Sequence, residues 1–95
     1  MPQENSKTLS IVIPVFNEIN YVNKLFDQIK IYFDKYNVEI IIVDDGSNDG
    51  SFETLSEIKE KKTYKFSFKL IKLDINSGKG KAIQIGIKNS VGEYI

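Results

Sequence analysis

Apolar and polar residues alternate with two different periods along the chain. Short apolar runs rich in β-branched residues occupy residues 9–15, 38–44 and 68–73, and these predict strands. Between the runs, apolar residues recur every three or four positions, which predicts helices from Glu18 to Tyr36, from Ser51 to Lys61 and over residues 81–90. Residues 92–95 then begin a fourth strand, so the predicted order is β-α-β-α-β-α-β.

Local signals set the ends of these elements. Pro14 lacks a backbone N–H and therefore belongs near the end of the first strand, which we expect to stop at Val15. Asn17 is expected to cap the first helix. The second run, VEIIIVD, is apolar almost throughout, as is typical of a central strand buried on both faces. Residues 1–8 are polar and are expected to form a flexible tail.

Strands that alternate with long helices predict an α/β fold. The expected architecture is a Rossmann-like parallel sheet with right-handed crossovers and helices on both faces. Ligands of such sheets bind outside the carboxyl ends of the strands. The polar candidates at those ends are Asn17, Glu18, Asp44, Asp45, Asp49 and Asp74.

Two adjacent carboxylates, Asp44 and Asp45, follow the central strand and suggest a binding site. Carboxylates there suit a divalent cation or the N–H donors of a base or sugar, and they repel phosphate unless a cation intervenes. The alternative is ordinary turn chemistry, in which Asp44 caps the strand end and Asp45 and Ser47 make turn hydrogen bonds. Asp49 would then cap the next helix, with Gly50 easing the bend, and for Asp49 we prefer this interpretation. For Asp45 we prefer a ligand, because a second acid adds charge repulsion and contributes little to a turn.

Composition narrows the chemistry. The 95 residues suffice for one small domain, and 13 basic residues balance 13 acidic ones, so no overall field draws the chain to nucleic acid. The absence of cysteine and histidine excludes disulfides and thiolate or imidazole metal ligands. The apolar runs are far shorter than a membrane span, and residues 1–8 lack the features of a secretion signal, so a cytoplasmic location is expected.

Three segments carry a resemblance to a known family. LSIVIPVFNE, EIIIVDDGSNDG and NSGKGKAIQIGIKNSVGEYI resemble, in order and spacing, the blocks that open the family 2 glycosyltransferases, especially the dolichyl-phosphate mannosyltransferase-like branch. The resemblance spans residues 9–95 and implies the N-terminal, nucleotide-sugar-binding half of a GT-A fold, with strand order 3-2-1-4 and the fourth strand truncated. It implies a UDP- or GDP-linked donor and a lipid-phosphate or glycan acceptor.

The resemblance also implies roles for single residues. Pro14, Asn17 and Glu18 would border the nucleotide, and Asp45 would accept a hydrogen bond from the base. A carboxylate can pair with the N3–H of uracil or with the N1–H and amino group of guanine. The full set of candidate nucleotide-binding residues is Pro14, Val15, Asn17, Glu18, Asp44, Asp45, Ser47 and Lys79.

The segment NSGKGKA invites a phosphate-loop interpretation that its spacing does not support. The first glycine that the Walker pattern needs is missing before Gly78 and Lys79, and Gly80 follows Lys79 where the pattern needs Ser or Thr. The glycines could simply allow a strand-to-helix turn with solvated lysines. The family resemblance instead places this loop near the donor diphosphate, where backbone N–H groups and Lys79 would help to bind it.

The family pattern continues beyond Ile95. An Asp-x-Asp motif that binds Mg²⁺ or Mn²⁺ follows a strand of the GEYI kind in these enzymes, and the catalytic base comes later. We therefore expect Mg²⁺ or Mn²⁺ in the full-length enzyme, no firmly bound metal and no catalytic residue in this chain, and no sugar transfer by it alone. Membrane contact is expected only through C-terminal parts or a lipid acceptor. A truncated sheet exposes an edge, which predicts self-association.

Two other classes of protein fit parts of the pattern. A phosphoacceptor receiver domain also pairs acids at a strand end to bind Mg²⁺, but there the acids follow the first strand, and here they follow the second. A non-catalytic interaction domain would keep the fold without the chemistry.

Overall fold

Three strands alternate with three helices along residues 9–90, the part of the chain that this computed structural model describes. The α/β class is therefore confirmed, whereas the expectations for residues 1–8 and for a fourth strand at 92–95 lie outside the described residues. The elements are β1 (Leu9–Val15), α1 (Ile19–Phe33), β2 (Val38–Asp44), α2 (Ser51–Lys61), β3 (Ser67–Lys72) and α3 (Lys79–Lys88).

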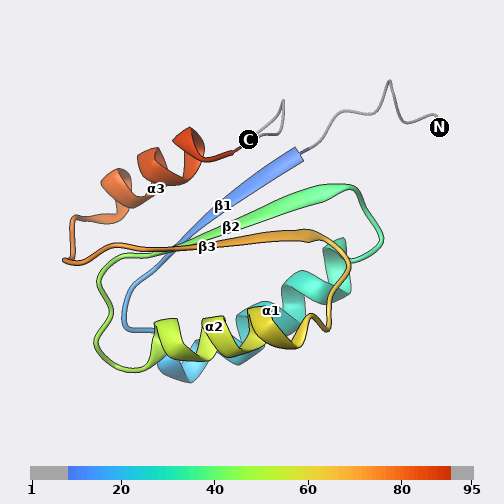
Figure 1. Cartoon of the computed structure of the whole chain (residues 1–95), viewed down its shortest axis with the longest axis horizontal. Coiled ribbons are helices and arrows are strands. Elements are labelled where there is room, and N and C mark those ends of the chain that lie inside the picture. Colours follow the sequence, from blue (N-terminus) through green and yellow to red (C-terminus); the bar gives the residue numbers. More distant parts are fainter. Residues whose placement is uncertain (1–8, 91–95) are drawn as a thin grey trace.

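The strands form one parallel sheet with β2 in the middle (Figure 1). Leu9 pairs with Val38 and Val15 with Asp44, so β1 and β2 end level with each other. All seven residues of β2 are buried, as the almost wholly apolar run predicted. The order of these three strands agrees with the prediction.

Side chains of β2 point alternately to two separate cores. Ile40 and Ile42 pack into the larger core beneath α1 and α2, where Phe26 contacts three other aromatic rings. Ile41 and Val43 pack on the opposite face with Ala82 of α3. Figure 1 shows the same arrangement, with α1 and α2 together on one side of the sheet and α3 on the other. Helices on both faces are thus confirmed.

Several element ends differ from the sequence prediction. The N-cap of α1 is Glu18, and Asn17 has a left-handed φ of 50°, so the expected cap at Asn17 is wrong. The helix ends at Phe33 because the chain turns there, with the Tyr36 N–H donating to the Phe33 carbonyl. The third helix begins at Lys79, two residues earlier than expected, because Gly78 with φ 97° reverses the chain immediately before it.

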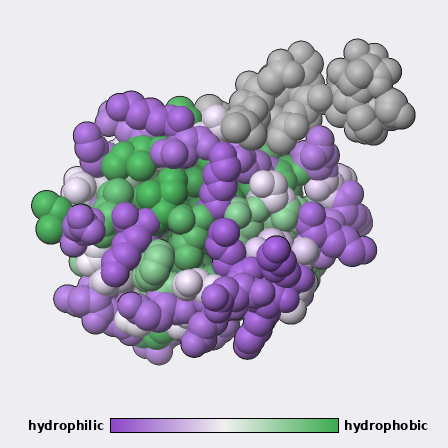
Figure 2. Space-filling model, viewed as in Figure 1, coloured by the Kyte–Doolittle hydropathy of each residue, from purple (hydrophilic) through white to green (hydrophobic). Residues whose placement is uncertain are grey.

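The surface of the described residues is mostly polar. Figure 2 shows an apolar area on the viewed face, along β3 between α3 and α2. Within residues 9–90, none of the helices has the length and apolar character needed to cross a bilayer.

Candidate functional site

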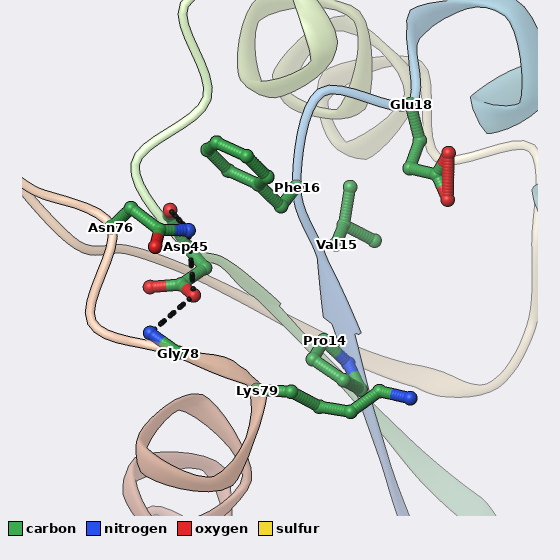
Figure 3. Close-up of a pocket in the computed structure, with 8 residues that line it drawn as sticks. All are labelled: Pro14, Val15, Phe16, Glu18, Asp45, Asn76, Gly78 and Lys79. Carbon is green, nitrogen blue, oxygen red and sulfur yellow. Dashed lines mark hydrogen bonds between the residues drawn. The ribbon is translucent and has the colours of Figure 1, made fainter.

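A cleft of about 370 Å³ opens at the carboxyl ends of β1 and β2, beside the first turn of α3 (Figure 3). This is the position at which parallel α/β sheets bind ligands. The cleft is lined by Pro14, Val15, Phe16, Glu18, Asp45, Asn76, Gly78 and Lys79. Three segments that are distant in sequence therefore form its walls.

One wall is the segment that joins β1 to α1. Val15 is buried, whereas the Phe16 ring is 45% exposed and the Glu18 side chain is exposed at the rim. The Asp45 N–H donates to the Val15 carbonyl over 2.8 Å, so the ends of β1 and β2 are held together. The wall thus presents an aromatic ring and one carboxylate to the cleft.

Asp45 forms the floor of the cleft and is only 3% exposed. Its Oδ1 accepts the Ser77 N–H at 2.7 Å, and its Oδ2 accepts the Gly78 N–H at 2.9 Å and the Asn76 amide at 3.1 Å. The last two contacts are among the dashed lines of Figure 3. A carboxylate offers about four lone-pair sites, so one site on Oδ1 is left after these three bonds.

Gly46 brings the loop after β3 close to Asp45. Its φ of 80° lies in the left-handed region, and a Cβ at this position would stand 2.5 Å from Asn76 N and 2.6 Å from the carbonyl carbon of Ile75. Any larger residue would therefore push the loop away from the sheet.

Asp44 lies behind the cleft and is fully buried. Its Oδ2 accepts the Ser47 N–H at 3.0 Å, and its Oδ1 has no hydrogen-bond partner within residues 9–90. The Ser47 hydroxyl accepts the Asn17 N–H at 2.8 Å, and the Asn17 side chain accepts the Asn48 N–H at 3.0 Å. These contacts join the β1–α1 and β2–α2 loops.

Asp49 connects the starts of two helices. Its Oδ1 accepts the N–H and the hydroxyl of Ser51, the first residue of α2, at 3.0 and 2.6 Å. Its Oδ2 accepts the Ile19 N–H of α1 at 3.1 Å, and the Ser51 hydroxyl accepts the Glu18 N–H. The Ser51 hydroxyl is the main cause that lowers the pKa of Asp49 below its ordinary value. The N-cap residue of α2 is Gly50, so the expected cap position at Asp49 is wrong by one residue. Asp49 nevertheless has a structural role, because it binds the first N–H of α2 and of α1.

Asp44, Asp45 and Asp49 bind three different sets of donors and do not converge. No group of three acidic side chains that could hold a metal ion occurs in the part of the chain that the structure describes. Glu18 is the exposed acid of the cleft, while Asp45 is already occupied by N–H donors. The described residues therefore do not fit a Mg²⁺ or Mn²⁺ site, and the buried Asp44 does not fit a receiver-type acidic pair.

The structure brings five of the eight predicted site residues together at the cleft: Pro14, Val15, Glu18, Asp45 and Lys79. Asn17, Asp44 and Ser47 stand behind it and support its loops. The candidate set lacked Phe16, Asn76 and Gly78, which also line the cleft. A signal existed for each, since Phe16 is an aromatic residue at a strand end and the other two belong to the NSGKG loop.

The fold and the cleft define an α/β domain with a parallel sheet and a candidate ligand site at the strand ends. A family model described as glycosyl transferase family 2 matches residues 10–95. The chain therefore belongs to glycosyl transferase family 2, as the three sequence blocks indicated.

Known proteins agree with this assignment. A dolichyl-phosphate beta-glucosyltransferase of Dictyostelium discoideum is 38% identical over 93 residues, which cover 90% of this chain and 28% of that protein. Among solved structures, a mannosyltransferase of Pyrobaculum calidifontis in complex with GDP-Man and Mn²⁺ matches 90% of this chain and 25% of its own, with a TM-score of 0.77 and 23% identity. The structure of Staphylococcus aureus TarS in complex with UDP matches 93% of this chain and 25% of its own, with a TM-score of 0.71 and 30% identity.

The chain spans between 14% and 30% of the length of the curated relatives that it matches. The match therefore concerns one part of those proteins.

Proposed function

We propose that the cleft binds the nucleoside diphosphate of a UDP- or GDP-linked sugar, as the donor-binding part of a glycosyltransferase. The observation that carries the proposal is the joint position of Phe16, Asp45 and Lys79 around one cleft at the carboxyl ends of β1 and β2. An aromatic ring suits a base, and a lysine beside a helix start suits a diphosphate. The family membership and the ligands of the two solved structures support this proposal.

Six of the eight lining residues then have a direct role in donor binding. The exposed Phe16 ring stacks on the base, and the base N–H approaches the acceptor site that remains on Asp45 Oδ1. Pro14, Val15 and Glu18 border the nucleotide, and the Lys79 side chain, which extends past Pro14 in Figure 3, contacts the diphosphate. Asn17, Asp44 and Ser47 contribute by holding the loops behind these residues.

The acceptor and the metal belong to the proposal for the whole protein. We propose transfer to a lipid-phosphate or glycan acceptor, and the names of the dolichyl-phosphate relatives from Dictyostelium and human support the lipid-phosphate. We place this reaction at the cytoplasmic face of a membrane. A divalent cation would neutralise charge on the departing diphosphate, with ligands other than those of residues 9–90. We propose that residues 1–95 alone bind the donor and do not transfer the sugar.

Titration of the chain with UDP and with GDP, followed by amide chemical shifts, tests donor binding. We expect a dissociation constant of about 0.1–1 mM for the preferred nucleotide, because the cleft is open and lacks a metal contact. Shifts should concentrate at residues 14–18 and 76–79. Phe16→Ala and Lys79→Ala should each weaken binding about fivefold, or roughly 1 kcal/mol.

Lys88→Ala is the matched control, because Lys88 lies at the other end of α3. It should leave the affinity unchanged. The proposal fails if neither nucleotide shifts the cleft residues at millimolar concentration, or if Lys88→Ala weakens binding as much as Lys79→Ala.

A further inference from the structure

We propose that Asp45 is a positioning residue, which acts on donor binding chiefly by holding the loop of residues 76–78 and thereby the start of α3. The inference rests on the proposed function of the cleft. In this role Asp45 does more than contact the base. By binding Gly78 it also fixes the position of Lys79, the residue that we propose contacts the diphosphate.

The carboxylate of Asp45 accepts hydrogen bonds from other residues of the chain. Three of its four acceptor sites are filled by donors from residues 76, 77 and 78, at 3.1, 2.7 and 2.9 Å, and the side chain is 3% exposed. Two of the donors are backbone N–H groups directly before α3. Such charge-assisted bonds are about twice as strong as neutral ones.

The loop has few other contacts that would fix it. Asp74, Ile75, Asn76 and Ser77 are exposed, and the Ile75 side chain is 72% exposed, so apolar burial contributes little to the loop conformation. Two further hydrogen bonds involve its side chains: the Ser77 hydroxyl donates to the Ile75 carbonyl, and the Asn76 amide donates to the backbone carbonyl of Asp45. The first lies within the loop, and the second again ends on Asp45. Directly before the loop, the Leu73 N–H donates to the Asp44 carbonyl at 2.9 Å. For residues 75–78, the Asp45 carboxylate is therefore the main hydrogen-bonded connection to the sheet.

Gly46, which has a left-handed backbone conformation, allows the loop to lie close to Asp45. It lets the backbone of residues 75 and 76 approach the residue next to Asp45 more closely than any side chain would allow. Gly78, whose N–H is bound by Asp45, is also the N-cap of α3, and Lys79 is the first residue of that helix. Hence a movement of the loop moves the N–H groups and the ammonium group that face the cleft.

The first test needs no ligand. In Asp45→Asn, an amide NH₂ replaces one acceptor, and in Asp45→Ala all three bonds are lost. We expect the amide protons of Ser77 and Gly78 to exchange with solvent about tenfold faster in the alanine variant, with an intermediate effect in the asparagine variant. Asp74→Ala, which removes an exposed carboxylate of the same loop, should leave these rates unchanged. Unchanged exchange in both Asp45 variants would overturn the inference.

The second test separates positioning from contact with the base. The affinity for UDP or GDP, whichever binds more tightly, is measured for Asp45→Asn, Lys79→Ala and the double variant. We expect Asp45→Asn to weaken nucleotide binding about tenfold and Lys79→Ala about fivefold. If Asp45 positions Lys79, the double variant should lose much less than fiftyfold, because Asp45→Asn has already displaced the lysine that Lys79→Ala removes. Multiplicative losses would show that Asp45 acts on the base alone.

The two proposals fail in different ways. Absence of nucleotide binding by the wild-type chain contradicts the proposed function, while the exchange rates of Ser77 and Gly78 still decide whether Asp45 holds the loop. Normal binding together with multiplicative losses contradicts the positioning role and leaves the donor site intact.

Discussion

Neighbouring acids in this chain serve separate parts of the backbone. Asp45 binds the N–H groups before α3, and Asp49 binds N–H groups at the starts of α1 and α2. Helix starts leave N–H groups without backbone partners, so a carboxylate near them is favoured both by hydrogen bonding and by the helix dipole. The sequence indicated that these acids sit at strand ends. The sequence could not assign the hydrogen-bond donors of these acids. Ile19, which donates to Asp49, and Ser77, which donates to Asp45, each lie about 30 residues away along the chain.

Asp49 should make stability depend on pH. Its folded-state pKa is lowered from the ordinary value of 3.8, chiefly by the Ser51 hydroxyl, so the unfolded chain takes up a proton first as pH falls. The contribution is therefore complete above about pH 4 to 5 and is lost as pH falls through the lower folded pKa. Urea unfolding between pH 7 and acid conditions should show a smaller acid-induced loss for Asp49→Asn than for wild type.

Asp27→Asn is the control, because Asp27 is an exposed acid on α1. It should keep the acid-induced loss of the wild type. An identical pH profile for Asp49→Asn and wild type would show that the contacts to Ser51 and Ile19 carry no net stabilisation.

Helices and strands were predicted with different success. β1, β2 and α2 have the bounds that the sequence indicated. In these three elements the spacing of the apolar residues and the residues that end helices or strands indicate the same bounds. The predicted ends of α1 and α3 were wrong, because they depend on backbone turns: Asn17 and Gly78 adopt positive φ, and Tyr36 closes a turn that periodicity does not register. Cleft residues Phe16 and Asn76 emerged only once the three segments were placed together.

The packing of α3 on the sheet predicts opposite effects for two glycines of one helix. A Cβ on Gly86 would lie 2.3 Å from Cγ1 of Val12, so Gly86→Ala should overpack the smaller core and cost about 1–3 kcal/mol. A Cβ on Gly80 would meet no atom within 4 Å, so Gly80→Ala should stabilise the chain by up to about 0.5 kcal/mol through helix propensity. Chemical denaturation of both variants measures the difference, and a stabilising Gly86→Ala would mean that α3 lies further from β1.

The two outer strands of the sheet formed by residues 9–90 differ in character. β3 carries Lys69 and Lys72, and lysines on an edge strand discourage pairing with another chain. β1 reads LSIVIPV, has no charged residue and is an outer strand of the sheet that residues 9–90 form, paired there with β2. Pro14 protects only its end. The net charge of zero adds no general repulsion between copies, so β1 is the edge at which two copies would pair.

We therefore expect the 95-residue chain to self-associate through β1. Sedimentation velocity over about two orders of magnitude in protein concentration should show a weight-average mass that rises with concentration. Leu9→Lys places a charge at the 36% exposed start of β1 and should reduce association. Ile75→Lys removes a more exposed apolar side chain, 72% exposed, from the loop before α3, and should leave association as in wild type. A chain that stays monomeric over the whole concentration range would contradict pairing through β1. Equal effects of Leu9→Lys and Ile75→Lys would instead show that exposed apolar side chains in general drive the association.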